Sequence, residues 1–377
     1  MTRTRTPAAG ARADAPAPPN ASGASARLRG RLQLALAGLW LLDGLLQFQP
    51  YMFSKNFAAQ TLQPAALGSP GWIATPVTWS AQLIEDHPVP ANAAFALIQV
   101  ALGLGIAYRR TRTAALACSA VWAAGVWYLG EGLGGLATGQ ANPLTGAPGS
   151  AGLYLLAAIL LLPGPSAPEG GIRGGAGGAP FAAGSAAIRL PGPRGAGDAA
   201  DGGGGAPFPA AGRIGPQAAD TVWSAFWLIL AYLTLLPVNR EPGAFGGALT
   251  GGMMSTGEPS WFTALDARAA HALDGADLAV SIVLAGALVL IAAAVWLPDP
   301  RARRAGLALA FLLAAAYWVF GQAFGMPFTG MATDPNTGPL LALLAAAYWP
   351  AGRARRTAPA ATARGPVTIR QAGAASP

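Results

Sequence analysis

The residues in this sequence that could do chemistry are a few polar groups set inside long apolar runs. Asp43 stands in GLWLLDGLLQFQP with Gln47 one helical turn later, and Gln99 lies in a second apolar run. Glu131 interrupts the glycine-rich run VWYLGEGLGGLATG. An ionisable group inside a bilayer is costly, so each charged residue here is a candidate functional group.

Two interpretations of Asp43 follow from its position. Trp40, Asp43 and Gln47 share one helical face. Desolvation favours the neutral form of a carboxyl, and a protonated Asp43 could donate a hydrogen bond or carry a proton. The alternative is a structural hydrogen bond between helices, with Gln99 as the partner.

Glu131 also has two interpretations, because a shift of about 191 positions places it opposite Gln322. Gln322 keeps the hydrogen-bond acceptor and loses the charge. This favours a structural role, in which the side chain satisfies backbone groups freed at a glycine bend. The alternative is a proton-binding site in the first copy that the second copy has lost.

The sequence contains no motif for several common classes of site. His87 and His271 are the only histidines and Cys118 is the only cysteine, so we predict no metal site and no intrachain disulfide. Both histidines are predicted to be loop residues. No phosphate-binding loop, nucleophile elbow or zinc-protease motif is present.

Composition predicts the elements that must position these residues. Of 377 residues, 53% are hydrophobic and only 11% are charged, where soluble domains carry about 25%. Several apolar blocks approach the roughly 20 residues of a spanning helix. The predicted spans are 32–49, 91–108, 113–130, 150–163, 221–237, 278–297, 304–321 and 338–350.

The two sets of four spans are related in sequence. The same shift places Trp127 opposite Trp318 and Gly134 opposite Gly325, and one residue further NPLTG at 142–146 lies over DPNTG at 334–338. We infer an internal duplication into parallel repeats. The predicted fold is an all-α integral membrane protein whose eight transmembrane helices form two parallel four-helix bundles.

The domain organisation follows from these repeats and from composition. It comprises a disordered cytoplasmic tail (1–28), a first four-helix membrane repeat (29–163), a flexible Gly/Ala/Pro-rich cytoplasmic linker (164–219), a second four-helix membrane repeat (220–350) and a disordered cytoplasmic tail (351–377).

Basic residues set the predicted orientation. The net charge of +8 lies in clusters between apolar blocks, and only Lys55, Arg240 and Arg268 fall on the other face. This predicts a multi-pass cell-membrane protein with both termini in the cytoplasm, and a lipid bilayer rather than nucleic acid as its partner.

Two further features concern the outer side. Amphipathic stretches at GWIATPVTWSAQLIEDHP and PSWFTALDARAAHAL are predicted to form short helices that lie as lids over each bundle. The short fourth and eighth spans are predicted to direct free backbone N–H groups outward, where an anion or a quinone carbonyl could bind.

The four-span unit resembles the DoxX/DoxD-type membrane proteins over residues 32–163 and, more weakly, 221–350. The residues that carry the resemblance are WLLDGLLQFQP, YMFSKNFA, a Pro-Ala-Asn entry to the second span and an arginine turn after it. The resemblance implies a quinone-linked or redox-accessory role, with quinone as the cofactor and a redox protein as a partner. It supplies no catalytic motif.

The leading hypothesis is therefore a quinone-interacting or redox-accessory membrane subunit, either with a redox partner or as a homo-oligomer. A transporter of a small solute and a non-catalytic assembly protein are the alternatives, and enzymatic activity stays open. The candidate intramembrane polar site comprises Asp43, Gln47, Gln99, Glu131 and Gln322.

Overall fold

The computed structural model describes residues 21–164, 208–251 and 258–350, and within these ranges all regular structure is helical. Three helices are long and apolar enough to cross a membrane: α4 (Pro88–Ala107), α11 (Asp277–Ala294) and the helical segment Pro300–Gly321 that contains α12. Two shorter helices, α6 (Ser150–Leu161) and α13 (Thr337–Ala347), are also apolar. These lengths and compositions indicate a membrane protein.

The first half of the chain contains α1 to α6. Helix α1 (Ala21–Leu46) packs along α4, and α5 (Arg112–Leu129) packs against α6. Between α1 and α4 lie short turns, α2 (Lys55–Phe57) and α3 (Gly71–Asp86). Close approach of α1 and α4 depends on Gly103, where a Cβ atom would lie 2.9 Å from the Ala37 carbonyl oxygen.

The second half repeats this order of helices. Helix α8 (Pro216–Thr234) packs on α11, α11 on α12 (Pro300–Ala316), and α12 on α13. The short helices are α7 (Ala211–Ile214), α9 (Ala244–Gly251) and α10 (Ser260–Ala272). Each predicted span therefore falls on a helix: α1, α4, α5 and α6 in the first half, and α8, α11, α12 and α13 in the second.

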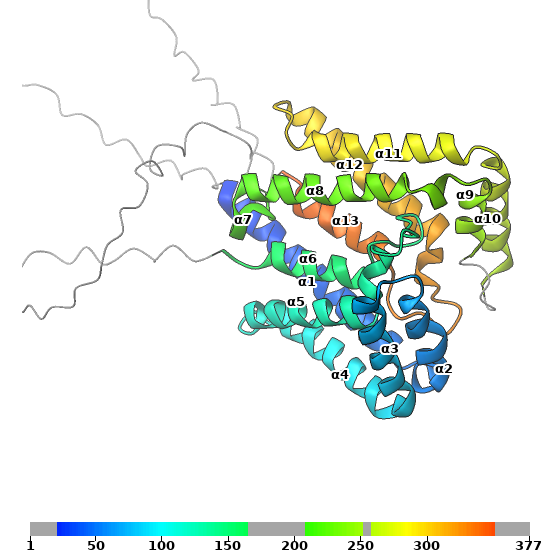
Figure 1. Ribbon diagram of the computed structural model, residues 1–377. Helices are drawn as coiled ribbons and strands as arrows, with labels where there is room; N and C mark the ends of the chain where they lie inside the picture. The colour runs from blue at the N-terminus through cyan, green and yellow to red at the C-terminus, as the bar shows by residue number, and fades with distance from the viewer. Residues whose placement is uncertain (1–20, 165–207, 252–257, 351–377) are drawn as a thin grey trace, which may run out of the picture.

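Figure 1 shows that the short helices gather at one end of the molecule. Helices α2, α3, α9 and α10 lie at the end opposite to the one where α1 and α8 begin. The α4–α5 and α11–α12 turns, which carry arginines, lie at that latter end. The two halves thus run in the same direction, with their predicted lids on one side.

The two halves form one body. Helices α6 and α13 pack against each other, α1 also contacts α13, and one hydrophobic core spans both halves. Two side-chain amides bond across the junction: Gln49 Nε2 donates to the Ala332 carbonyl at 2.9 Å and Asn239 Nδ2 to the Ala141 carbonyl at 2.9 Å.

Two predicted boundaries are wrong. Residues 21–28, expected in the tail, form the first turns of α1. Residues 208–219, expected in the linker, are ordered because Phe208 is buried and the Ala210 amide donates to the Ala347 carbonyl at 2.9 Å. The remainder of the predicted tails and linker, 1–20, 165–207 and 351–377, lies outside the described residues.

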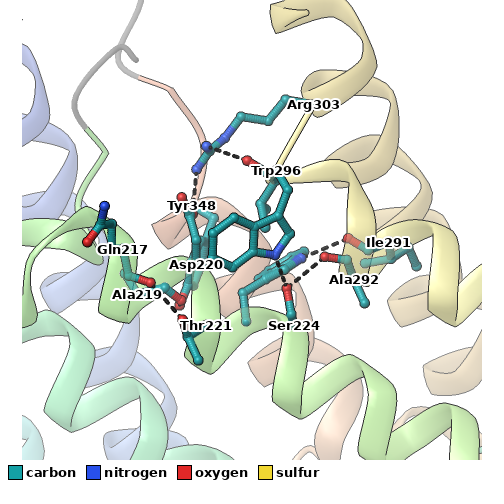
Figure 2. Close-up of polar contacts among 12 residues, drawn as sticks. Gln217, Ala219, Asp220, Thr221, Ser224, Ile291, Ala292, Trp296, Arg303 and Tyr348 are labelled. Atoms are coloured by element: carbon teal, nitrogen blue, oxygen red, sulfur yellow. Dashed lines mark hydrogen bonds and ion pairs between the residues drawn. The ribbon is translucent and has the colours of Figure 1, made fainter. Parts of the chain in front are cut away.

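A polar network closes the end of the second half where α8 begins (Figure 2). Arg303 on α12 contacts Asp220 on α8 at 3.1 Å and donates to the Val295 carbonyl at 3.1 Å. Its guanidinium also lies 4.5 Å from the centre of the Phe208 ring. The Tyr348 hydroxyl donates to the Ala219 carbonyl at 2.6 Å, which joins α13 to α8.

We predict that Arg303→Ala destabilises the protein by about 2 kcal/mol, because it leaves the largely enclosed Asp220 carboxylate without a partner. Asp220→Asn should cost much less, since an amide oxygen still accepts from Arg303. The first half contains such a pair, in which the amide oxygen of Gln33 accepts from the Arg112 guanidinium at 3.3 Å. Thermal unfolding in detergent compares the two variants, and equal losses would contradict this ranking.

Candidate functional site

A cavity of about 1200 Å³ lies in the first half of the protein, among α1, α3, α4, α5 and α6. Four of the five residues predicted for the site line it: Asp43, Gln47, Gln99 and Glu131. Gln322 does not line it and instead bonds to the start of α13. The structure therefore brings together the four candidates of the first copy and places the fifth elsewhere.

Helix α1 positions the deep end of the cavity. Asp43 lies on this helix and Gln47 directly follows its last residue, one turn further, and both side chains are buried. The neighbouring Trp40 is fixed by its Nε1 group, which donates to Ser119 Oγ at 2.8 Å, and its ring lies 4.2 Å from that of Tyr154. Asp43 and Gln47 are thus held against α5 and α6 by an anchored aromatic pair.

Several buried polar atoms around the cavity have no hydrogen-bond partner within the described ranges. They are Asp43 Oδ1, Gln47 Oε1, Gln99 Oε1, Trp122 Nε1 and the Tyr154 hydroxyl, the last of which faces the Asp43 carboxyl. Buried polar groups are normally bonded, so these atoms are available to a ligand or to water. The structural bond expected between Asp43 and Gln99 is not formed.

Helix α3 forms the outer wall of the cavity. Trp79, Ser80 and Leu83 on α3 line it, and Ser80 Oγ donates to the Leu129 carbonyl at the end of α5 at 2.6 Å. The Tyr128 hydroxyl of α5 donates to the Trp72 carbonyl at 2.7 Å. The amphipathic stretch predicted as a lid therefore covers the first bundle.

The mouth of the cavity opens between α3, α4 and α5. Its lining includes exposed residues from all three helices, among them Trp79, Ala94, Cys118 and Val121. Because these side chains are apolar, the cavity opens through an apolar part of the surface.

Glu131 caps the amino end of α6. Its Oε1 accepts from Ser150 Oγ at 2.8 Å and from the Ala151 amide at 3.0 Å. An anion that approached α6 would meet this carboxylate, so the predicted binding of an anion at that helix end is not supported. At α13, Gln322 Oε1 accepts from the Gly338 amide at 3.0 Å in the same way.

The environment of Glu131 changes its acidity. Burial raises the pKa of this carboxyl to about 7, and the nearby Asp334 carboxylate adds to the rise. The bonds from Ala151 and Ser150 act in the opposite direction. Glu131 lies beyond the end of α5, and a pKa of about 7 means that both of its protonation states are populated near neutral pH.

Asp334 is a site residue that the sequence interpretation missed. It belongs to the second half, yet it lines the cavity of the first. Its position is fixed because Oδ1 accepts from the Asn336 amide at 2.7 Å and Oδ2 from Thr333 Oγ1 at 2.8 Å. A signal was present in the predicted alignment of NPLTG with DPNTG, which places Asp334 opposite the uncharged Asn142.

The two histidines differ in placement. His87, at the α3–α4 junction, is exposed and lines the cavity, whereas His271 on α10 does not line it. Within the described residues, no three His, Cys, Asp or Glu side chains are close enough to hold a metal ion.

No family model, no curated protein and no solved structure matches this chain. The resemblance to the DoxX/DoxD group therefore rests on the sequence motifs alone.

Proposed function

We propose that this chain is an eight-span membrane protein, duplicated from a four-helix unit, that binds a quinone in the cavity of its first repeat as a redox-accessory subunit. The observation that carries the proposal is the set of unpartnered polar atoms that line a mainly apolar cavity with an apolar mouth.

Matching contacts in the two halves support the duplication. Trp127 Nε1 donates to the Pro148 carbonyl at 2.7 Å, and Trp318 Nε1 donates to the Pro335 carbonyl at 2.8 Å. These pairs favour placing Pro148 over Pro335, so the turn of the first repeat is longer than the predicted alignment of NPLTG with DPNTG allows.

The glycine bends that follow α5 and α12 also correspond. Residues 132–135 all have positive φ, at 54°, 58°, 62° and 70°, and residues 323–326 have φ of 47°, 56°, 81° and 56°. Positive φ is rare for residues other than glycine, and four such residues occur in these runs: Leu133, Ala323, Phe324 and Met326. The recurrence of a run directly after Glu131 and after Gln322 supports a common origin.

The lining of the cavity favours an amphiphilic ligand. Its walls are mainly apolar, its mouth is apolar, and its volume accommodates a ring with part of an isoprenoid chain. Trp122 Nε1 and the Tyr154 hydroxyl can donate to quinone carbonyl oxygens. Asp43 and Gln99 supply oxygens that accept from the hydroxyl groups of the reduced form.

Orientation follows from the arginine turns. Arg109, Arg110 and Arg112 border the α4–α5 turn, and Arg301 and Arg303 border the α11–α12 turn, at one end of the molecule. We place this end in the cytoplasm of a cell-membrane protein, with the lid helices outside.

Equilibrium binding of decylubiquinone to the full chain in nanodiscs tests the proposal. We expect Trp122→Phe and Tyr154→Phe each to weaken binding about tenfold, which corresponds to one hydrogen bond lost to the ligand. Trp227→Phe is the matched control, because Trp227 Nε1 is also buried without a partner but lies outside the cavity. Absence of binding by the unmodified protein, or equal effects of Trp122→Phe and Trp227→Phe, would refute the proposal.

A further inference from the structure

A second hollow adjoins the cavity at its outer end. It has a volume of about 420 Å³ and is formed by residues 64–67, the loop that follows α5, and Asn336. Both hollows are lined by Ala65, Glu131, Ser150 and Asp334. Glu131 and Asp334 therefore stand at the boundary between the two.

The second hollow differs from the first in polarity and access. Thr138, Gln140, Asn142 and Thr145 line it, and Gln140 and Thr145 are exposed to solvent. A polar hollow of this size that opens to solvent holds water. Its lining includes residues 64–67, which directly precede the lid helix α3, so it forms an aqueous vestibule on the side of that lid.

The charges around the two hollows are one-sided. Asp43 on α1, Glu131 after α5 and Asp334 in the 333–336 turn are carboxyls, and no lysine or arginine lines either hollow in the part of the chain described. The other titratable groups that face them are Tyr154 on α6, His87 at the α3–α4 junction and Cys118 on α5. No basic side chain of the described residues therefore balances these three carboxyls inside the hollows.

We propose that Glu131 and Asp334 form a proton-exchange gate that connects the buried cavity, including Asp43, to the aqueous vestibule on the lid side. The inference deepens the proposed function, on which it rests for the nature of the ligand whose protons the gate would exchange. Each step breaks one O–H bond at a donor carboxyl or water and forms one at the acceptor, and no electron moves. The pKa of Glu131 near 7 suits this role, since both protonation states are populated at neutral pH.

Two variants are designed to preserve the fold. Glu131→Gln introduces the residue that caps α13 in the second repeat, where Gln322 accepts from the Gly338 amide. Asp334→Asn keeps Oδ1 as the acceptor for the Asn336 amide, which bonds it at 2.7 Å. Both changes remove a titratable group and keep a hydrogen-bond acceptor.

Infrared spectroscopy of the full chain in phosphatidylcholine vesicles, without added quinone, tests the gate. The carboxylic C=O band that Asp43→Asn removes should shift rapidly when H₂O is replaced by D₂O. We expect Glu131→Gln to slow this exchange roughly hundredfold and Asp334→Asn to slow it to a smaller degree. Asp220→Asn, a carboxyl change outside both hollows, should leave the rate unchanged.

Exchange at the unmodified rate in Glu131→Gln, or absence of the Asp43 band in the unmodified protein, would overturn the gate. The exchange rates are measured without quinone, so they test the gate alone. Absence of decylubiquinone binding would overturn the proposed function but would not change these rates. Thermal unfolding of each variant verifies that the fold is retained.

Discussion

Gly134→Ala is expected to abolish folding of the first repeat. Gly134 has a φ of +62°, and an added Cβ atom would overlap the Pro148 carbonyl and lie 2.7 Å from the Gly149 amide nitrogen. That loop cannot move freely, because Trp127 Nε1 bonds the same carbonyl. The backbone overlap and the left-handed conformation together should cost about 4 kcal/mol or more.

Gly139→Ala is the control for this prediction. Gly139 has a φ of +73° in the same loop, yet an added Cβ atom would meet nothing within 4 Å. Only the conformational cost applies, at about 1 kcal/mol. Yield of monodisperse protein and thermal unfolding in detergent distinguish the two variants. Similar stabilities would mean that the loop is not anchored as the structure shows.

The helices of this fold were predictable because their cause lies in the sequence itself. Long apolar blocks bounded by arginines and prolines define α4, α11 and α12, and each of the other predicted spans also coincides with a helix. Boundaries were less predictable where tertiary contacts decide them. Phe208, in a Gly/Ala/Pro-rich stretch, is ordered by its contacts with Tyr348 and Arg303.

Part of the candidate site was also predictable from the sequence. Asp43 and Gln47 share a helical face, and their polarity inside an apolar run marks them without any tertiary information. The involvement of Asp334 required the packing of one half against the other, which the repeat pattern does not encode. The backbone amides at the start of α6 were predicted to be free. In the structure the Ala151 amide donates to Glu131, a contact that forms only when the glycine bend brings Glu131 next to α6.

Gly125→Phe is expected to eliminate quinone binding while the protein stays folded. Gly125 lies on α5 and lines the cavity, and an added Cβ atom there meets nothing within 4 Å. A phenylalanine ring would occupy the space of the ligand. We expect the affinity for decylubiquinone to fall at least hundredfold, about 2.7 kcal/mol. Stability should hold or rise, since glycine within a helix costs about 1 kcal/mol relative to alanine.

Gly286→Phe provides the matched control. Gly286 lies within α11, is exposed, lines neither hollow, and has equal room for a Cβ atom. It should leave binding unchanged. Because Gly125→Phe alters no hydrogen-bonding group, its effect reports only whether the ligand needs this space. Unchanged affinity in Gly125→Phe, together with a loss in Trp122→Phe, would place the ligand on the Trp122 edge of the mouth instead of inside the cavity.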